Sequence, residues 1–340
     1  MRKILQAWIF IYGMKHMKLT KKRILVTGGA GFIGGYVAKK LLSLGSDVSV
    51  IDIEIHKASV FSLEKLKSQV KYTNLDIRDR TKTLQFFRKY TFDSVIHLAA
   101  EPIVEHGYDD PLNTFDTNIM GTAHILEALR ISSPNTSVIV ASSDKAYGKS
   151  KDKSYTEESP LSGDHPYDVS KSCTDLIAQT YAKTYGMPIV VTRFGNVYGG
   201  GDVHLNRIVP GICMAIIDKK KLEVRSDGTY VRDYIFVEDV ADGYIFLLKN
   251  MDKAAGQVYN FSSDDNYSVL DLIHRASEYF HGKISYKVLN TAKNEIPYQH
   301  LDYSKIRKLG WTPNTSLKTG LEKTLAWYQE YYKRIQNDQK

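Results

Sequence analysis

The chain has 340 residues, 43% of them hydrophobic, which is enough to bury a sizeable core as one large domain or as a large domain with a smaller one. Its two cysteines, Cys173 and Cys213, exclude a disulfide framework and a cysteine-based metal site, and they indicate a reducing compartment. The net charge of +8 comes without a concentrated basic block or a nucleic-acid-binding motif, so we assign it to a lysine-rich surface and expect no nucleic-acid partner.

The first twenty residues are expected to precede the folded domain, which begins near Lys21. Their apolar stretch, residues 4–12, is too short to span a bilayer, and no small-residue cleavage site follows it. We therefore expect neither a signal peptide nor a membrane partner, and Met14 or Met17 is a candidate for the true start. No other segment approaches transmembrane length, which predicts a cytoplasmic protein.

From Lys21 onward, short β-branched runs alternate with amphipathic stretches. The runs that we predict to be buried strands are 23–27, 48–52, 70–76, 94–100, 137–143 and 188–193. Helices are predicted between them near residues 32–44, 79–90, 112–131 and 166–185. Because the strands are almost continuously apolar, the alternation predicts a parallel sheet that helices cover on both faces, in a doubly wound α/β fold.

The regular alternation ends after the last of these strands, where glycine-rich loops, short strands and helices follow. We therefore divide the chain into an extra segment at 1–20, a sheet domain at 21–196 and a smaller lobe that makes up most of 197–335. Within the last range, residues 197–232 and 265–316 are most typical of a separate lobe. What lies between them is expected to belong to the last elements of the sheet.

The turn after the first predicted strand holds three spaced glycines, Gly28, Gly31 and Gly34. A tight turn and the close approach of a pyrophosphate both exclude a Cβ atom, and the following helix supplies backbone N–H groups and a positive dipole end. Asp52 ends the second strand about 20 residues on, where its carboxylate can accept hydrogen bonds from ribose hydroxyls and would repel a 2′-phosphate. The pattern predicts a Rossmann-type site for NAD rather than NADP.

With these glycines, the chain resembles the extended short-chain dehydrogenase/reductases, in the NAD-dependent epimerase/dehydratase branch that acts on nucleotide sugars. The resemblance runs from about residue 21 to 330 and is carried by the GxxGxxG turn, DIRD (76–79), HLAA (97–100), NIMGTAHILEAL from Asn118, and YDVSK (167–171). It implies that NAD is bound by Gly28, Gly31, Phe32, Ile33, Gly34, Asp52, Asp76, Ile77, Leu98, Ala99, Ala100, Asn118, Tyr167 and Lys171.

Tyr167 and Lys171 are four residues apart on a predicted helix, so both side chains are expected on one face. A nearby ammonium and the positive nicotinamide ring favour the phenolate and are expected to lower the pKa of Tyr167. The phenolate can then take a proton from a sugar hydroxyl while hydride leaves the same carbon for NAD⁺. Ser143 is expected to share the hydrogen bond of that hydroxyl.

Ser143, Asp144 and Lys145 stand in consecutive positions directly after a predicted strand. A 4-epimerase needs only the Ser–Tyr–Lys set, whereas a 4,6-dehydratase also needs a base for the C5 proton and an acid for the C6 hydroxyl. The dTDP-glucose dehydratases carry an Asp–Glu pair here, and the Asp–Lys pair of this chain resembles the CDP-glucose 4,6-dehydratases. The resemblance implies conversion of CDP-glucose to CDP-4-keto-6-deoxyglucose.

The role of Lys145 stays open at this point. A free lysine has a pKa near 10.4; burial and like charges would lower that value, while Asp144 would raise it. A neutral Lys145 would take the C5 proton itself. A charged Lys145 would stabilise the enolate while another group or water takes the proton.

Three further residues are implied to contact the nucleotide sugar in the smaller, substrate-binding lobe. Asn196 and Arg232 match family residues that reach the diphosphate, and Arg207 is placed where it could meet the nucleotide. A guanidinium suits this role because it donates two parallel hydrogen bonds to phosphate oxygens. The residues leave open which base the nucleotide carries, and whether the sugar is glucose, another hexose or a heptose.

The same residues bear on two alternative functions, a 4-epimerase and a non-catalytic NAD-binding regulator, and on a second copy of the chain as partner. The Asp144–Lys145 pair counts against a 4-epimerase, and an intact Ser143, Tyr167 and Lys171 count against a non-catalytic NAD-binding regulator. Family members pair their two long helices into a four-helix bundle, which implies a homodimer here. The apolar residues of the second helix, among them Leu176 and Ile177, would lie at that interface or pack against the sheet.

Overall fold

The structure of the protein is a computed structural model that describes residues 18–149, 154–291 and 296–338. The predictions about the start of the chain, at Met14 or Met17, concern residues outside these ranges. Within them, no helix is both long enough and apolar enough to cross a membrane.

A seven-stranded sheet forms the centre of the molecule, with the strand order β10-β6-β5-β4-β1-β2-β3. Every neighbouring pair in it is parallel. Its strands are β1 (Arg23–Thr27), β2 (Asp47–Asp52), β3 (Lys71–Asn74), β4 (Ser94–His97), β5 (Ser137–Ala141), β6 (Ile189–Phe194) and β10 (Val258–Phe261). The first six lie where the sequence predicts strands, although β4 and β5 end earlier because the chain leaves the sheet toward the loops described below.

The seventh strand, β10, is not among the predicted strands. Its sequence VYNF is only four residues long and carries the fully buried Asn260 near its centre, so its apolar pattern is weak. The side-chain nitrogen of Asn260 donates to the backbone carbonyls of Tyr155, at 2.9 Å, and Asp302, at 3.1 Å. Pairing with β6 and these distant contacts hold the strand in place.

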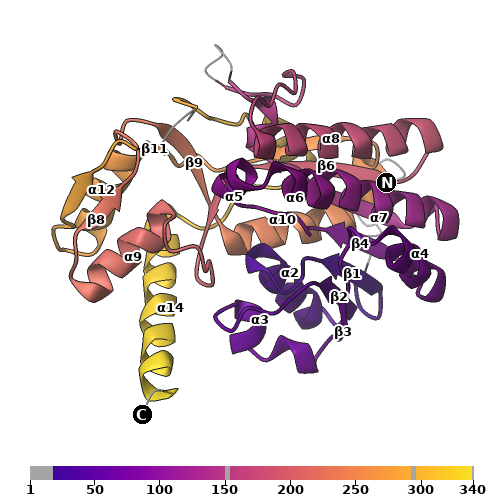
Figure 1. Ribbon diagram of the computed structural model, residues 1–340, viewed down its shortest axis with the longest axis horizontal. Coiled ribbons are helices and arrows are strands. Elements are labelled where there is room, and N and C mark those ends of the chain that lie inside the picture. Colours follow the sequence, from indigo (N-terminus) through magenta and orange to yellow (C-terminus); the bar gives the residue numbers. More distant parts are fainter. Residues whose placement is uncertain (1–17, 150–153, 292–295, 339–340) are drawn as a thin grey trace, which may run out of the picture.

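Helices cover both faces of this sheet (Figure 1). Ile24 and Val26 of β1 belong to one hydrophobic cluster and Leu25 to another, because successive side chains of a strand point to opposite faces. The helices are α2 (Phe32–Ser43) and α10 (Val237–Lys249) on the first face, and α4 (Arg80–Lys89), α7 (Gly121–Ser132) and α8 (Pro166–Tyr185) on the second. The predicted doubly wound α/β fold is confirmed.

The predicted helix near 112–131 is interrupted. Pro111 starts a short helix whose N-terminus is capped by Asp110, and a π-helical turn separates that helix from α7. The π turn directs Asn118 inward, where the side chain is 1% exposed. The short elements on this side of the sheet are α5 (Val104–Asp109), α6 (Pro111–Phe115) and the π turn η2 (Asp116–Met120).

Most of the residues after β6, apart from α10 and β10, build a second lobe around another hydrophobic cluster. It contains the three-stranded sheet β11-β9-β7 and the pair β12-β8. Figure 1 shows this lobe, with α9, α12 and α14, beside the seven-stranded domain. Its elements are β7 (Asn196–Tyr198), α9 (Ile208–Asp218), β8 (Leu222–Val224), β9 (Val231–Phe236), β11 (Asn266–Ser268), α12 (Val269–Tyr279), β12 (Tyr286–Val288) and α14 (Leu317–Asp338).

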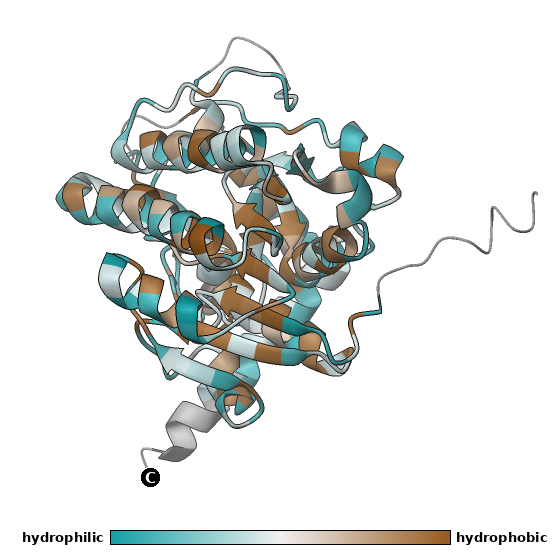
Figure 2. Cartoon of the chain, turned by 90° about the vertical axis from the view of Figure 1, so that its right-hand side faces the viewer, coloured by the Kyte–Doolittle hydropathy of each residue, from teal (hydrophilic) through white to brown (hydrophobic). Residues whose placement is uncertain are grey.

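The remaining short elements connect these layers. Figure 2 shows the hydrophobic strands of the large sheet in the interior and hydrophilic residues on the outward sides of the helices. These connecting elements are α3 (Val60–Leu63), η1 (Leu66–Ser68), η3 (Asp144–Tyr147), α11 (Met251–Ala254) and α13 (Ser304–Leu309). Of these, the 3-10 turn η3 follows β5 and carries two of the candidate catalytic residues.

Candidate active site

The glycine turn after β1 lies against the loop after β4. Gly28 has φ +66°, and a Cβ atom on it would come within 2.7 Å of the Ala99 backbone nitrogen. The hydroxyl oxygen of Thr27 accepts from the backbone N–H groups of Leu98 and Ala99, both at 3.2 Å. β1 and β4 lead to helices on opposite faces of the sheet, so their carboxyl ends form the kind of crevice in which doubly wound folds bind ligands.

Helix α2 begins at Phe32, directly after Gly31, without a side-chain cap. A Cβ atom on Gly34 would come within 2.1 Å of the Gly28 carbonyl oxygen, so this first turn packs on the glycine turn only because position 34 is glycine. Phe32 and Ile33 pack on the hydrophobic clusters and fix the direction of the helix. The uncapped N–H groups and the helix dipole favour an anion such as pyrophosphate.

Asp52 ends β2 beside the same turn. One carboxylate oxygen accepts from the Ala30 backbone N–H at 2.9 Å, and the other accepts from the Ile53 N–H at 2.8 Å. Burial is the largest effect on its pKa and raises it, against the lowering by these two backbone hydrogen bonds. The side chain is thus fixed next to the glycine turn, where a ribose would follow a bound pyrophosphate.

Asp76 and Ile77 lie in the loop after β3. The Arg78 guanidinium holds the Asp76 carboxylate, with the closest contact at 2.6 Å, and lowers its pKa. Ile77 is 4% exposed and packs so tightly on α7 that a Cβ atom on Gly121 would come within 2.5 Å of its side chain. The loop is therefore rigid and lies at the same edge of the sheet as the glycine turn.

Asn118 joins the loop after Ala100 to α8. Its side-chain oxygen accepts from the Glu101 N–H at 2.7 Å, and its nitrogen donates to the Glu101 carbonyl at 3.1 Å and to the Ser170 hydroxyl at 2.9 Å. It therefore fixes the loop after β4 relative to the helix that carries Tyr167. This is a positioning role that the resemblance does not specify.

Ser143, Tyr167 and Lys171 come together between the end of β5 and the first turns of α8. Lys171 is 6% exposed, and its ammonium donates to the Ala141 carbonyl at 3.1 Å. Burial lowers the pKa of Lys171 to about 8, against the negative charge of Asp175. The Ser143 side chain lies close enough to Tyr167 to act on the pKa of its phenol, which it lowers.

The protein's own groups together raise the pKa of Tyr167. Although the residue keeps part of its surface exposed, burial of the phenol raises its pKa to about 12. The Ser143 side chain and the charge of Arg207 act in the opposite direction, but their effects are smaller. The predicted lowering includes the charge of a bound nicotinamide ring, which is not among these contributions, so it stays a prediction.

Asp144 and Lys145 lie in η3, next to Ser143. The Ser143 hydroxyl donates to Asp144 Oδ1 at 3.0 Å, and Asp144 is 5% exposed. Burial raises the pKa of Asp144, while the charges of Lys145 and Arg232 lower it. Lys145 Nζ donates to Gln299 Oε1 at 2.5 Å. The turn therefore holds a buried acid and a cation next to the serine.

The three expected substrate residues come from the second lobe. Arg232 lies in β9, is 6% exposed, and its charge acts on Asp144. Arg207 precedes α9, donates to Asp202 Oδ2 at 3.1 Å, and its charge acts on Tyr167. Asn196 starts β7, which pairs with β9. Both arginines thus lie within electrostatic reach of the proposed catalytic groups.

Two residues at this site were not singled out from the sequence. Asp168 follows Tyr167 directly and is 4% exposed, and Gln299 is 1% exposed and contacts Lys145. Asp168 lies inside the YDVSK motif, so its position in the motif was the available signal. Gln299 comes from a segment that runs beside β9 through a bridge between Tyr298 and Val231, and no local pattern indicates that pairing.

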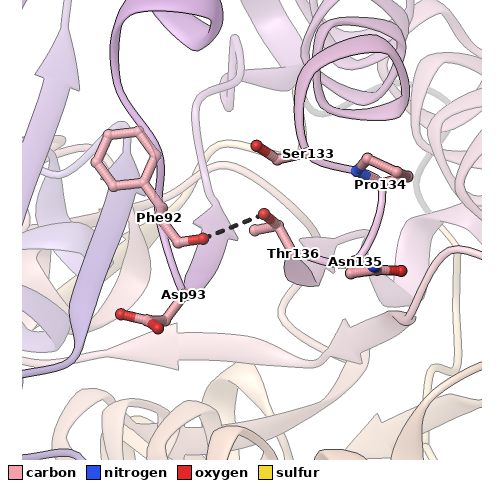
Figure 3. A pocket seen from close by; sticks show the side chains of 6 residues that line it. All are labelled: Phe92, Asp93, Ser133, Pro134, Asn135 and Thr136. Carbon is pink, nitrogen blue, oxygen red and sulfur yellow. Dashed lines mark hydrogen bonds between the residues drawn. The ribbon is translucent and has the colours of Figure 1, made fainter.

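Away from the candidate site, a pocket of about 300 Å³ is lined by Phe92, Asp93 and residues 133–136 (Figure 3). In it the Thr136 hydroxyl donates to the Phe92 carbonyl at 3.1 Å. These residues precede β4 and β5, so the pocket lies at the amino ends of the strands, opposite the catalytic groups. Within the described residues, no cluster of His, Cys, Asp or Glu could hold a metal ion.

The family model and the relatives that match this chain are those of nucleotide-sugar 4,6-dehydratases. Residues 25–324 match the model of the family described as GDP-mannose 4,6 dehydratase. The chain is 31% identical to a dTDP-glucose 4,6-dehydratase of Neisseria meningitidis over 334 residues, covering 90% of this chain and 93% of that protein. It is 30% identical to a trifunctional UDP-glucose 4,6-dehydratase of Arabidopsis thaliana, where it covers 91% of this chain but spans about half, 47%, of the relative's length.

Solved structures with this fold include two kinds of enzyme. A double mutant of the dTDP-glucose 4,6-dehydratase DesIV from Streptomyces venezuelae, with NAD bound, superposes with a TM-score of 0.83 at 29% identity, covering 91% of this chain and 97% of that one. The UDP-glucuronic acid 4-epimerase from Bacillus cereus, in complex with UDP-glucuronic acid and NAD, gives 0.82 at 27% identity, covering 91% and 100%.

Proposed function

Since the chain belongs to the GDP-mannose 4,6-dehydratase family, we propose that it is an NAD-dependent 4,6-dehydratase of nucleotide-diphosphate hexoses. In that reaction C4 is oxidised, water is eliminated across C5 and C6, and hydride is returned to C6. NAD supplies the hydride chemistry and is restored in each turnover. The Rossmann-type domain at 21–196 holds the cofactor, and most of 197–335 holds the substrate.

The residues divide between the two halves of the reaction. Tyr167 takes the proton of the C4 hydroxyl, and Ser143 shares the hydrogen bond to that oxygen. Lys171, buried and donating to the Ala141 carbonyl, provides a positive charge beneath the same site. Asp144 and Lys145 act in the elimination that follows.

The observation that carries this proposal is the buried Asp144 carboxyl. It is 5% exposed, and burial raises its pKa, so it holds a proton more readily than an exposed aspartate. The Ser143 hydroxyl contacts it at 3.0 Å, which puts this acid next to the hydroxyl of the oxidation step. Oxidation at C4 and departure of the C6 hydroxyl take place on carbons separated only by C5, and this pair supplies a group for each step.

For the nucleotide we propose CDP, and for the sugar glucose. The support is the Asp144–Lys145 pair, which resembles the CDP-glucose dehydratases, whereas the relatives named above act on dTDP-glucose and UDP-glucose. Arg232 and Asn196 are the proposed diphosphate contacts, with Asn196 in the neighbouring strand β7, where it pairs with Tyr234 of β9. Arg207 is proposed to meet the nucleotide.

A 4-epimerase is the second candidate, because the epimerase from Bacillus cereus superposes as closely as the dehydratase. Incubation with CDP-, dTDP- and UDP-glucose, GDP-mannose and UDP-glucuronic acid, followed by mass spectrometry and sugar analysis, separates the two. We expect loss of one water from CDP-glucose. A product of unchanged mass with altered stereochemistry would instead establish the epimerase, and loss of water only from another sugar nucleotide would refute CDP-glucose as substrate.

Replacing Asp52 with alanine is expected to weaken NAD binding about tenfold to a hundredfold, because hydrogen bonds to a charged acceptor are lost. The same change removes the repulsion of a 2′-phosphate, so the preference for NAD over NADP should shrink. Titration of both dinucleotides measures this, with Asp52→Asn as the control that keeps an acceptor oxygen. A wild-type protein that prefers NADP would contradict the assignment.

We also propose a homodimer built on α7 and α8. Leu176 of α8 is 52% exposed and Met120, just before α7, is 47% exposed, whereas Ile177 packs toward the sheet. Leu112 and Ile131 add to the exposed apolar surface on this side. A second copy of the chain would cover it, as in the four-helix bundle that the family resemblance implies. Light scattering at micromolar concentration should give twice the mass of the chain, and a monomer would refute the proposal.

A further inference from the structure

Asp168 is a buried carboxylate to which the mechanism above gives no role. It is the second residue after Pro166 in α8, follows Tyr167 directly and is 4% exposed. The hydrogen bonds found among the described residues use its backbone carbonyl, which accepts from the Ser172 hydroxyl at 3.1 Å, but none uses its carboxylate oxygens. A carboxylate that is largely buried and accepts no hydrogen bond from the described residues is costly to ionise, so its presence at this position calls for a reason.

The face of α8 that carries Asp168 packs on η3. Ser172 lies one helical turn after Asp168 on the same face, and its hydroxyl donates to the Ala146 carbonyl at 2.8 Å. On the other side, a Cβ atom on Gly163 would come within 2.4 Å of the Asp168 carbonyl carbon. Asp168 is therefore fixed between the loop before α8 and the turn that contains Asp144 and Lys145.

The charges around Asp168 come from both of these elements. In η3, Lys145 lowers its pKa and Asp144 raises it; in the loop before α8, His165 lowers it and Asp164 raises it. Burial is the largest effect, and the pKa is raised to about 6. At neutral pH most of the carboxyl is then ionised, with a pKa close to the working pH, which suits a general base.

The contacts of Lys145 suit an ammonium. Its Nζ donates to Gln299 Oε1 at 2.5 Å, and its positive charge acts on both Asp144 and Asp168. The Gln299 side chain is buried, and the N–H of residue 299 donates to the Val231 carbonyl, which holds the segment beside β9. An ammonium only donates hydrogen bonds, so it can stabilise a developing negative charge but cannot accept a proton.

We propose, building on the dehydratase function above, that Asp168 is the catalytic base that takes the C5 proton, while Lys145 remains charged and stabilises the enolate. The C5–H bond breaks, its proton goes to the Asp168 carboxylate, and its electron pair forms the enolate with the C4 oxygen. The C4 carbonyl then re-forms as the C6–O bond breaks, and the departing hydroxyl takes a proton from Asp144 and leaves as water. When hydride returns to C6, Asp168 protonates C5, and in D₂O its carboxyl proton exchanges with solvent before this step.

The test is Asp168→Asn, compared in D₂O with the wild type and with Asp164→Asn, an exposed aspartate four residues earlier. The variant should still reduce NAD⁺ when given substrate, because Ser143, Tyr167 and Lys171 are intact. Incorporation of deuterium at C5 should fall at least about a hundredfold, as expected for loss of a general base. At neutral pH Asp164→Asn should keep wild-type exchange, because loss of the Asp164 charge only lowers the Asp168 pKa further below that pH. Asp168→Glu should restore part of the exchange.

The pH dependence gives a second readout. Exchange at C5 by the wild type should fall below about pH 6, where Asp168 becomes protonated. In Lys145→Met the residual exchange should also fall at acidic pH, and this acidic limb of the pH profile should lie at a higher pH than in the wild type. The reason is that the charge of Lys145 lowers the Asp168 pKa. If Lys145 were the base, the limb would disappear with it.

Three outcomes would overturn the proposal: exchange at the wild-type rate in Asp168→Asn, loss of the acidic limb in Lys145→Met, or loss of C4 oxidation in Asp168→Asn that Asp168→Glu does not restore. The last would show that Asp168 serves the fold. Failure of the dehydratase function itself is distinct, because the wild type would then neither exchange C5 nor release water from any nucleotide hexose.

Discussion

Lys145→Met is expected to lower the rate of water elimination by about 10²–10³-fold while leaving oxidation at C4 intact. The magnitude is that of removing one donor that stabilises a developing oxyanion. Lys145 lies in the turn after Ser143 and contacts Gln299, so the change removes the charge from the elimination step without touching Tyr167 or Lys171. The measurement is single-turnover mixing with CDP-glucose, following reduced cofactor by absorbance and 6-deoxy product by mass spectrometry.

The matched control is Lys149→Met. Lys149 is an exposed lysine in the same loop, with its ammonium 3.8 Å from Asp164. The Lys149→Met substitution removes one positive charge from the same loop and should leave both oxidation at C4 and elimination of water unchanged. If Lys145→Met eliminates water at the wild-type rate, Lys145 is an ordinary surface neighbour and the dehydratase proposal loses one of its two elimination groups.

Tyr167→Phe is expected to slow oxidation at C4 by about 10²–10⁴-fold, the usual contribution of a general acid or base. Both later steps then stop for lack of the 4-keto sugar. The phenolate of Tyr167 is the group proposed to accept the hydroxyl proton, and phenylalanine has no oxygen to accept it. Reduction of NAD⁺ by substrate in a single turnover measures the effect.

Tyr185→Phe is the control, because Tyr185 ends the same helix and is 52% exposed. CDP binding to the Tyr167→Phe variant, measured by calorimetry, should stay within a few-fold of the wild type, since the hydroxyl removed is not among the proposed nucleotide contacts. A Tyr167→Phe protein that still oxidises C4 at the wild-type rate would contradict the role given to this residue.

The fold could be predicted because its signals are local. The β-branched runs and the helices between them follow from hydrophobic periodicity, and the turn at Gly28 follows from its spacing to Gly34. A Cβ atom at either position would overlap backbone atoms. The glycine spacing in the sequence therefore reflects the absence of room for a side chain in the fold. Strand β10 and the π turn around Asn118 could not be predicted, because pairing with β6 and packing against α8 decide them.

At the site, the sequence indicated residue identities better than their electrostatics. Ser143, Asp144 and Lys145 stand out as consecutive polar residues after a strand, and Tyr167 and Lys171 by their spacing. Burial, which is a property of the folded protein, raises the pKa of Tyr167 and could not be inferred from the residue types around it in the sequence. The neighbourhoods of Asp168 and Gln299 depend on contacts across the chain, which no single stretch of sequence reveals.

The most direct test of the dehydratase proposal uses CDP-glucose carrying deuterium at C4. The proposed reaction removes hydride from C4 and returns it to C6 within one turnover, so the 4-keto-6-deoxy product should carry the deuterium in its methyl group. Nuclear magnetic resonance of the isolated product locates the label. Deuterium that stays at C4 of a product with unchanged mass would show epimerisation and contradict the account.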